Sequence, residues 1–438
     1  MAIHISINEQ TEEENMKKIL AIVLALVMVL ALAACGGTQT TERKGMSEDL
    51  LPRKAVSTTV QIPDDFKIGM ICLHDENSTY DNNFIQALKS VKEGLGLKDE
   101  QVVIVPNIGE DNSCYDAAVD LAGSKGCKVV FADSFGHEQF LARAAKEYPN
   151  VQFCHATGTS AKTGGIKNLH NAFASIYEGR YLAGIAAGLK LNEMIESGKI
   201  TKEQAVIGYV GAFTYAEVVS GMTSFYLGAR SVCESATMKV RYTGSWYDQS
   251  KEQEAAKSLI ETDKCVLISQ HADSLGAPTA CELAGVPNVS YNGSTYSAGK
   301  NTFIVSSAIN WAPYFKYIIE TVVSGGEIDA DWCGDIDANS VVLSGLNQDV
   351  AAAGTAEKID EAVKAFAAGT LHVFDTSKFT VEGKTMTEYM IDFDGDKTPE
   401  SNVIHDGYFD ESNAKLFRSA PYFDLTIDGV TNLNTNFG

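Results

Sequence analysis

The chain has 438 residues, of which 45% are hydrophobic, 9% aromatic and 21% charged. These proportions are those of globular proteins, and they exclude a disordered, collagen-like or polytopic membrane chain as a description of the whole. The length predicts two or three domains, and 57 acidic against 35 basic residues give a net charge of −22, which disfavours nucleic acid as a partner.

The first predicted element is an apolar run of 16 residues, 19–34, which follows Met16 and two lysines. Such a helix rises about 24 Å, short of a hydrocarbon core of about 30 Å, so residues 1–34 are predicted to be a signal peptide whose translation begins at Met16. The small residues before Cys35 resemble the lipobox of bacterial lipoproteins, which implies a diacylglycerol anchor on Cys35. The alternative is a short buried helix with an incidental cysteine.

Residues 35–59 are rich in Thr, Ser, Gly and charge, with little apolar periodicity. This composition predicts a flexible tether that lets a folded body stand off the membrane.

Apolar runs of strand length then alternate with helical patterns, as in parallel sheets built from strand–helix–strand units. In the first series, strands are expected at 66–73, 101–105, 128–132 and 151–155, with helices at 84–95, 117–121 and 140–148. In the second series, strands are expected at 205–210, 238–243, 265–269, 288–291 and 302–306, with helices at 177–191, 215–232, 251–260, 277–284 and 314–323.

The two series predict an α/β fold of two Rossmann-like, doubly wound lobes joined by a hinge. Lobe 1 is expected to hold residues 60–176 and about 305–325, and lobe 2 residues 177–304 and about 326–438. Ligands of open α/β sheets lie beyond the carboxyl ends of the strands, so two facing sheets would place their loops around one cleft.

The acidic C-terminal part has weaker patterning. A helix is expected at 356–368, and the rest is expected to wrap one lobe. Asp392, Asp394 and Asp396 alternate as in calcium loops, but Lys397 and Val403 replace the Gly and Glu that an EF-hand needs. An ordinary solvated turn is the preferred interpretation, and no metal site is predicted.

Signature motifs of nucleotide hydrolysis, zinc proteolysis and serine hydrolysis do not occur in the chain. This absence favours binding over catalysis. Gly179, Gly184 and Gly188 recur at helical spacing, which is typical of close helix packing rather than of a phosphate cradle. The eight cysteines beyond Cys35 fall mostly in predicted strands and helices and are expected to be mainly free thiols.

Several segments resemble the basic membrane protein family of solute-binding lipoproteins, which serve purine-importing ABC transporters. Besides the lipobox, the resemblance rests on residues 78–83, 131–136, 177–188, 244–248, 270–274, 291–292 and 310–314. It covers about residues 66–325, with weaker similarity to about 374.

The resemblance implies a type I periplasmic-binding-protein fold, an extracytoplasmic lipid-anchored location, a membrane permease as partner and a purine base or nucleoside as ligand. No cofactor and no enzymatic activity are expected, and the chain is expected to be monomeric. Asn292 follows Tyr291 where nucleoside-binding members carry the Asp that contacts ribose, so the chain departs from those members there. Residues 270–273 look more like the branch that binds free bases, and adenine, guanine, hypoxanthine and xanthine all stay open.

A purine needs aromatic plates for its faces and directional polar groups for its rim. We expect the plates among aromatic residues at predicted strand-to-helix junctions, namely Tyr80, Phe135, Trp246 and Trp311. The polar contacts are expected from Asp81, Gln270, Asp273 and Asn292. Asp273 as a helix cap, Asn292 as a turn residue and the aromatic residues as core remain alternatives. His137 and His271 are weighed as bases or metal ligands and set aside, since neither has a partner at ligand spacing.

Three alternative functions stay open. The ligand could be a sugar, an autoinducer or a nucleoside-like precursor, the chain could be an exported metal-dependent nucleoside hydrolase, or it could be a tethered sensor that signals to a partner other than a permease.

Overall fold

The computed structural model describes residues 43–393, 397–399, 401–435 and 437. The predicted signal peptide, Cys35 and residues 394–396 of the Asp-rich segment lie outside these residues. Within the described part of the chain, no helix is both long and apolar enough to cross a membrane. The described residues from Gly45 onward form one compact unit.

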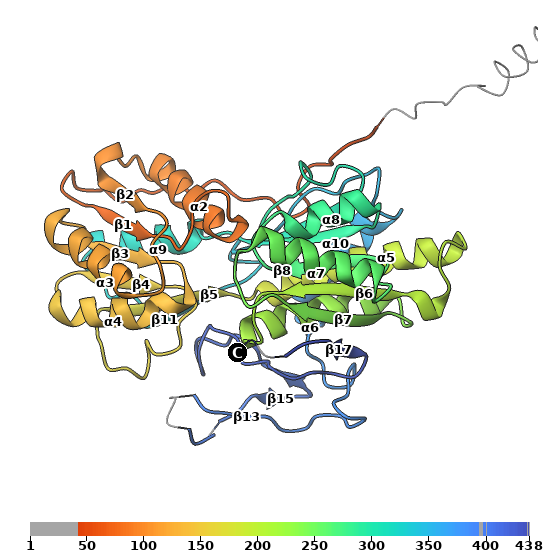
Figure 1. The fold of residues 1–438 in the computed structure, drawn as a ribbon. Helices are drawn as coiled ribbons and strands as arrows, with labels where there is room; N and C mark the ends of the chain where they lie inside the picture. The colour runs from red at the N-terminus through yellow and green to blue at the C-terminus, as the bar shows by residue number, and fades with distance from the viewer. Residues whose placement is uncertain (1–42, 394–396, 400, 436, 438) are drawn as a thin grey trace, which may run out of the picture. The chain divides into compact units, whose positions relative to one another are not determined.

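Lobe 1 is built on a six-stranded sheet in the order β11-β5-β4-β3-β1-β2, and every neighbouring pair is parallel (Figure 1, orange and yellow). Its strands β1 and β3 are fully buried apolar runs, as expected in the middle of a parallel sheet covered on both faces. The strands are β1 (Ile68–Ile71), β2 (Val102–Val105), β3 (Val129–Ala132), β4 (Gln152–His155), β5 (Leu169–Ala174) and β11 (Asp331–Gly334). The helices are α2 (Thr79–Leu95), α3 (Asn112–Val119), α4 (Glu138–Glu147) and α9 (Ala312–Val323).

Lobe 2 is built on a seven-stranded sheet in the order β12-β10-β9-β8-β6-β7-β17, parallel except for β12 (Figure 1, mainly green and cyan). The strands are β6 (Val206–Gly211), β7 (Thr237–Tyr242), β8 (Leu267–His271), β9 (Asn288–Tyr291), β10 (Phe303–Ile309), β12 (Val341–Leu343) and β17 (Val430–Asn432). The helices are α5 (Ile176–Glu196), α6 (Ala216–Val232), α7 (Gln249–Glu261), α8 (Gly276–Ala284) and α10 (Thr355–Ala367).

The glycines of α5 serve helix packing. A Cβ at Gly184 would collide with the carbonyl oxygen of Phe225, and one at Gly188 with that of Ala229, both on α6. The close approach of α5 and α6 therefore depends on these two glycines, and the packing interpretation is confirmed.

The chain crosses between the lobes later than the sequence analysis expects. Strand β10 lies wholly in lobe 2, so the second crossing follows Ile309 rather than residue 304. Strand β11 pairs with β5 of lobe 1, so the return crossing lies between Gly334 and Val341 rather than near 325. The expected boundary at 325/326 is thus wrong, because β11 is a short strand with a polar first residue that carries no apolar run.

The predicted tether is also corrected, because residues 45–59 pack on the folded body. Met46 bridges to Asn347 and Leu51 to Leu343. Arg53 donates to Asn83, and the Thr58 hydroxyl donates to Glu320. Backbone pairing with the β12 region and a few apolar side chains hold this segment without any helical or strand periodicity that the sequence would reveal.

The chain beyond α10 forms an extension of short strands that packs on lobe 2. Phe374 stacks on Phe423 with ring centroids 4.5 Å apart, and both belong to the lobe 2 core. Strand β17 adds to β7 at the sheet edge, and the pairs β13 (Met390–Ile391) with β14 (Ser401–Asn402) and β15 (Ile404–His405) with β16 (Tyr408–Phe409) complete the extension. All eight cysteines of the described residues are free thiols, and seven are buried, as expected.

Candidate ligand-binding site

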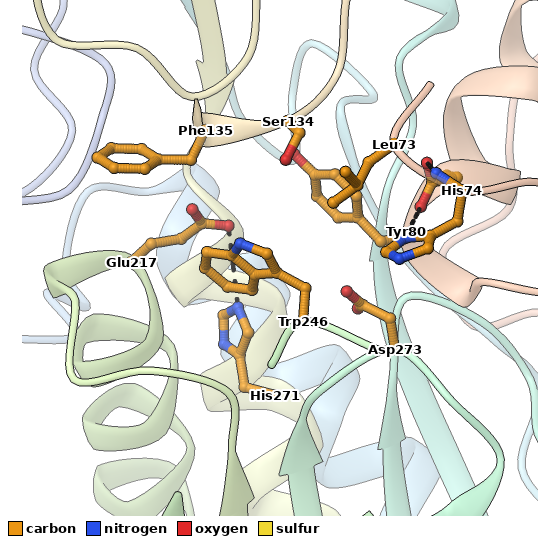
Figure 2. A pocket seen from close by; sticks show the side chains of 10 residues that line it. Leu73, His74, Tyr80, Ser134, Phe135, Glu217, Trp246, His271 and Asp273 are labelled. Atoms are coloured by element: carbon orange, nitrogen blue, oxygen red, sulfur yellow. Dashed lines mark hydrogen bonds and ion pairs between the residues drawn. The ribbon is translucent and has the colours of Figure 1, made fainter. Parts of the chain in front are cut away.

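A cavity lies between the two lobes, where strands of both sheets end. From lobe 1 it is lined by Leu73, His74, Tyr80, Asp81, Ser134 and Phe135. From lobe 2 it is lined by Glu217, Trp246, His271 and Asp273. Each lies at the end of a strand, just beyond it or in the first turn of the helix that follows, which is where open α/β sheets place their ligands. Figure 2 shows the side chains converging from both sides.

The lobe 1 wall is fixed around the start of α2. The Tyr80 hydroxyl donates to the carbonyl oxygen of Asp133 at 2.8 Å, which holds the ring at the cavity. Asp81 accepts from the His74 backbone N–H at 2.7 Å and from the Ser78 hydroxyl at 2.6 Å. Burial acts to raise the pKa of Asp81, but the hydrogen bonds from His74 and Ser78 outweigh it and lower that pKa. Asp81 therefore borders the cavity chiefly as the group that orders its loop.

Aromatic rings from both lobes meet on one side of the cavity. Phe135, which is 39% exposed, lies 5.4 Å from the Tyr215 ring, and Tyr215 stacks on Phe213 at 5.1 Å. Trp246 packs edge-on against Phe213 at 4.9 Å. These contacts hold the Trp246 indole in place, and the indole lines the cavity (Figure 2).

Asp273 supplies a buried carboxyl group to the opposite side. Its carbonyl oxygen accepts from the Thr79 N–H at 2.9 Å, and its Oδ1 accepts from the Asn292 Nδ2 at 3.1 Å. Burial, reinforced by the nearby Glu252, raises the pKa of Asp273 well above its usual range. A carboxyl group in that state can donate as well as accept a hydrogen bond at a ligand rim.

Glu217 and His271 form a second polar pair. The Glu217 carboxylate lies 3.9 Å from the His271 Nε2 and accepts from the Thr157 hydroxyl of lobe 1 at 3.0 Å. Burial lowers the pKa of His271 despite the opposing effect of Glu217. The imidazole is therefore neutral at physiological pH and offers one donor and one acceptor.

Three residues expected at the site lie outside the cavity lining. Trp311 is 1% exposed and stacks on Phe84 at 4.3 Å inside the lobe 1 core, because its place at the start of α9 faces α2 rather than the other lobe. Gln270 points to the opposite side of β8 from His271, since neighbouring strand residues alternate, and its Oε1 accepts from Asn288. Asn292 lies behind Asp273 and positions it.

Tyr80, Asp81, Phe135, Trp246 and Asp273 are the expected residues that the structure brings together at the cavity. Leu73, His74, Ser134, Glu217 and His271 were not selected from the sequence. The position of Glu217 in the first turn after β6 matches that of Tyr80 after β1, and this shared junction position was the available signal.

One group in the described part of the chain has metal-ligand residue types in proximity. Ligand atoms of Cys72, Asp81 and Asp133 lie within 4.8 Å of one another, and all three residues are buried. Burial raises the pKa of Cys72 and of Asp133 well above their usual ranges, so both favour the protonated form that binds metal poorly. The group fits a hydrogen-bonded support behind the cavity better than a metal centre.

Comparisons with known proteins agree with this architecture. A purine-binding protein of Brucella abortus is 32% identical over 262 residues, which are 59% of this chain and 69% of that protein. A Haloferax volcanii protein named as an ABC transporter glucose-binding protein is 35% identical over 207 residues, 47% of this chain. The chain spans about half (49%) of the Haloferax protein's length.

Solved structures show the fold. An ABC transporter solute-binding protein of Conexibacter woesei superposes with a TM-score of 0.55 at 20% identity, over 70% of this chain and 98% of that one. A solute-binding protein of Aeropyrum pernix gives 0.54 at 16% identity, over 73% and 82%. The expected periplasmic-binding-protein type of fold is therefore confirmed.

The family model for PnrA-like ABC transporter substrate-binding proteins, Bmp, matches residues 76–368, which hold both sheets apart from β1 and β17. The match includes nearly all of the cavity lining, Leu73 and His74 excepted. This chain belongs to the PnrA-like ABC transporter substrate-binding protein family.

Proposed function

We propose that this protein captures a purine base in the cavity between its lobes and delivers it to a membrane permease. The chain acts outside the cytoplasm as a monomer, held at the membrane by a lipid on Cys35. The nucleoside form of the ligand is the close alternative, and the family and the purine-binding Brucella relative support both.

The observation that carries the proposal is the composition of the cavity wall. Tyr80 and Phe135 from lobe 1 and Trp246 from lobe 2 provide rings for a flat heteroaromatic ligand. Asp273 and Glu217 lie on different sides and can accept N–H groups from the ligand rim (Figure 2). Stacking contributes about 1–3 kcal/mol per ring, and micromolar affinity needs about 8 kcal/mol, so the polar groups must supply the remainder.

The charge of the wall favours a neutral or N–H-rich ligand. The ten lining residues include three carboxylic side chains and neither Lys nor Arg. A phosphate would find no cationic partner there and would be repelled by Glu217. Nucleotides are therefore disfavoured relative to bases and nucleosides.

Hydrogen bonds between the two lobes stabilise the arrangement in which the lobes meet around the cavity. Thr79 of lobe 1 donates to Asp273 of lobe 2, and Thr157 of lobe 1 donates to Glu217 of lobe 2. Both lobe 2 partners line the cavity, so a ligand that engages them favours the arrangement in which the lobes meet. A permease that recognises this arrangement then distinguishes loaded from empty protein.

Titration calorimetry of the purified full chain against adenine, guanine, hypoxanthine, adenosine and glucose tests the proposal. We expect at least one purine base to bind with a dissociation constant of about 10 μM or lower. The absence of measurable binding to every purine would overturn the proposal.

The name of the Haloferax relative makes a sugar the second candidate, and glucose binding without purine binding would establish it. Incubation with adenosine, followed by chromatography, tests the hydrolase alternative. Recovery of intact nucleoside opposes that alternative, and release of free base supports it.

A further inference from the structure

A second cavity adjoins the first. The two share Phe135 and Glu217 as lining residues. Figure 2 shows these two side chains on the same side of the first cavity, away from His74 and Asp273. A ligand seated in the first cavity therefore has a neighbouring compartment beyond Phe135 and Glu217.

The C-terminal extension supplies one wall of this compartment. Arg418, Ala420 and Pro421 line it, and they lie beyond residue 368, where the family match ends. Thr159 of lobe 1 and Tyr215 of lobe 2 contribute the facing walls. The compartment thus depends on a segment that the matched family region does not contain.

Buried hydrogen bonds hold this segment against lobe 1. The Ser419 N–H donates to Asp331 Oδ2 at 2.7 Å, and the Ser419 hydroxyl donates to Asp331 Oδ1 at 2.5 Å. Asn171 Nδ2 also donates to the Ser419 oxygen at 3.0 Å. Four residues further on, Phe423 is anchored in the lobe 2 core, so the wall is fixed at both of its ends.

The charged groups of the compartment already have partners within its walls. Arg418 donates to the carbonyl oxygens of Ala420 and Pro421, each at 3.3 Å, and its guanidinium lies over the Tyr422 ring. Glu217 accepts from Thr157. The surface left for an occupant comes mainly from the Phe135 and Tyr215 rings together with small apolar side chains.

We infer that this compartment receives a neutral, largely apolar substituent carried by the heteroaromatic ring in the first cavity. The inference rests on the proposed function and makes the preferred ligand a substituted purine larger than the free base. Burial of such a group removes apolar surface from water, which favours binding.

Calorimetry with the full chain tests the inference with adenine, N6-benzyladenine and 9-benzyladenine. We expect at least one benzyl derivative to bind as tightly as adenine or more tightly. Thr159→Trp fills the compartment from an exposed loop position, and the Thr159 backbone bond to Glu138 does not depend on the side chain. This variant should weaken the binding of that derivative by about tenfold or more. Its affinity for adenine should stay within about twofold of that of the unmodified protein.

Thr163→Trp places the same side chain on the same loop, outside both cavities, and should change neither affinity. The inference is overturned if both benzyl derivatives bind at least about tenfold more weakly than adenine to the unmodified protein, or if Thr159→Trp affects adenine and the derivative equally. In either case adenine binding keeps the proposed function intact, whereas failure of all three compounds to bind removes both proposals.

Discussion

Asn83 of α2 donates a hydrogen bond from its Nδ2 to the carbonyl oxygen of Asn292, 2.6 Å away in the other lobe. The Asn83 Oδ1 in turn accepts from Arg53 at 2.6 Å. Asn292 extends the connection to the cavity, because its own amide donates to Asp273. A chain of hydrogen bonds thus joins the N-terminal segment, both lobes and the candidate site.

Replacing Asn83 by Ala is expected to weaken ligand binding by about three- to tenfold, since one interlobe hydrogen bond contributes about 0.5–1.5 kcal/mol to the closed arrangement. Calorimetry with the best purine measures the effect. Asn82→Ala is the matched control, because the Asn82 side chain bonds to Gln86 within the same helix. Equal losses in both variants would contradict the role of the interlobe bond.

Asn292 adopts a left-handed backbone conformation with φ of 64°. Asn292→Ala and Asn292→Gly both remove the amide that donates to Asp273, so their difference isolates the backbone. We expect the Ala variant to be less stable than the Gly variant by about 1 kcal/mol in urea unfolding, because a Cβ disfavours this conformation. Identical unfolding curves would show that the backbone relaxes at no cost.

Substitutions at Trp246 and Trp311 are expected to affect different properties, ligand affinity at the first position and stability at the second. Trp246→Ala removes a ring at the cavity and should lower purine affinity by about 10- to 100-fold, as measured by calorimetry. Trp311→Ala removes a core ring stacked on Phe84 and should reduce the free energy of unfolding by about 3–5 kcal/mol. Trp332→Ala, outside the cavity, serves as the binding control. An unchanged purine affinity in Trp246→Ala would show that the indole does not contribute to ligand binding.

The buried Glu411 makes stability depend on pH. Burial raises its pKa to about 7, from an ordinary value of 4.5 that applies to the unfolded chain. Between these values the folded state binds a proton that the unfolded state has lost, so the contribution of Glu411 to stability falls as pH rises from about 4.5 to about 7.

Glu411→Gln keeps an acceptor for the Tyr422 and Phe423 N–H groups and removes the titration. From about pH 5.5 to about pH 8, the variant should lose about 1–2 kcal/mol less unfolding free energy than the unmodified chain. Urea unfolding at the two pH values measures this, and Glu388→Gln, at an exposed position of the same extension, is the control. If the unfolding free energy of Glu411→Gln depends on pH in the same way as that of the unmodified chain, another group is responsible for the pH dependence.

The sequence predicted the strand–helix alternation well, because buried parallel strands and amphipathic helices carry strong apolar patterns. Strand β5 was missed since its run Leu169–Ala174 contains His170 and Asn171. Both side chains form hydrogen bonds to β11 or its flanking residues, a long-range pairing that local periodicity does not encode.

The site was predicted in part for a similar reason. Tyr80 and Trp311 both occupy strand-to-helix junctions, yet Tyr80 faces the cavity and Trp311 faces Phe84. The orientation of each side chain depends on which helix packs against its junction, and only the tertiary structure determines that packing. Glu217 resembled an ordinary acidic residue of a first helical turn, so its place beside His271, which lies at the end of another element of lobe 2, was evident only from the tertiary structure.

The fixed segment between Ser419 and Phe423 limits how far the two lobes can separate. Its ends are bound to different lobes, and four residue steps reach at most about 14 Å when fully extended. While Asp331 retains Ser419, the lobes cannot separate at this point by more than that reach. The extension therefore restrains how far the two lobes can move apart beside the candidate site.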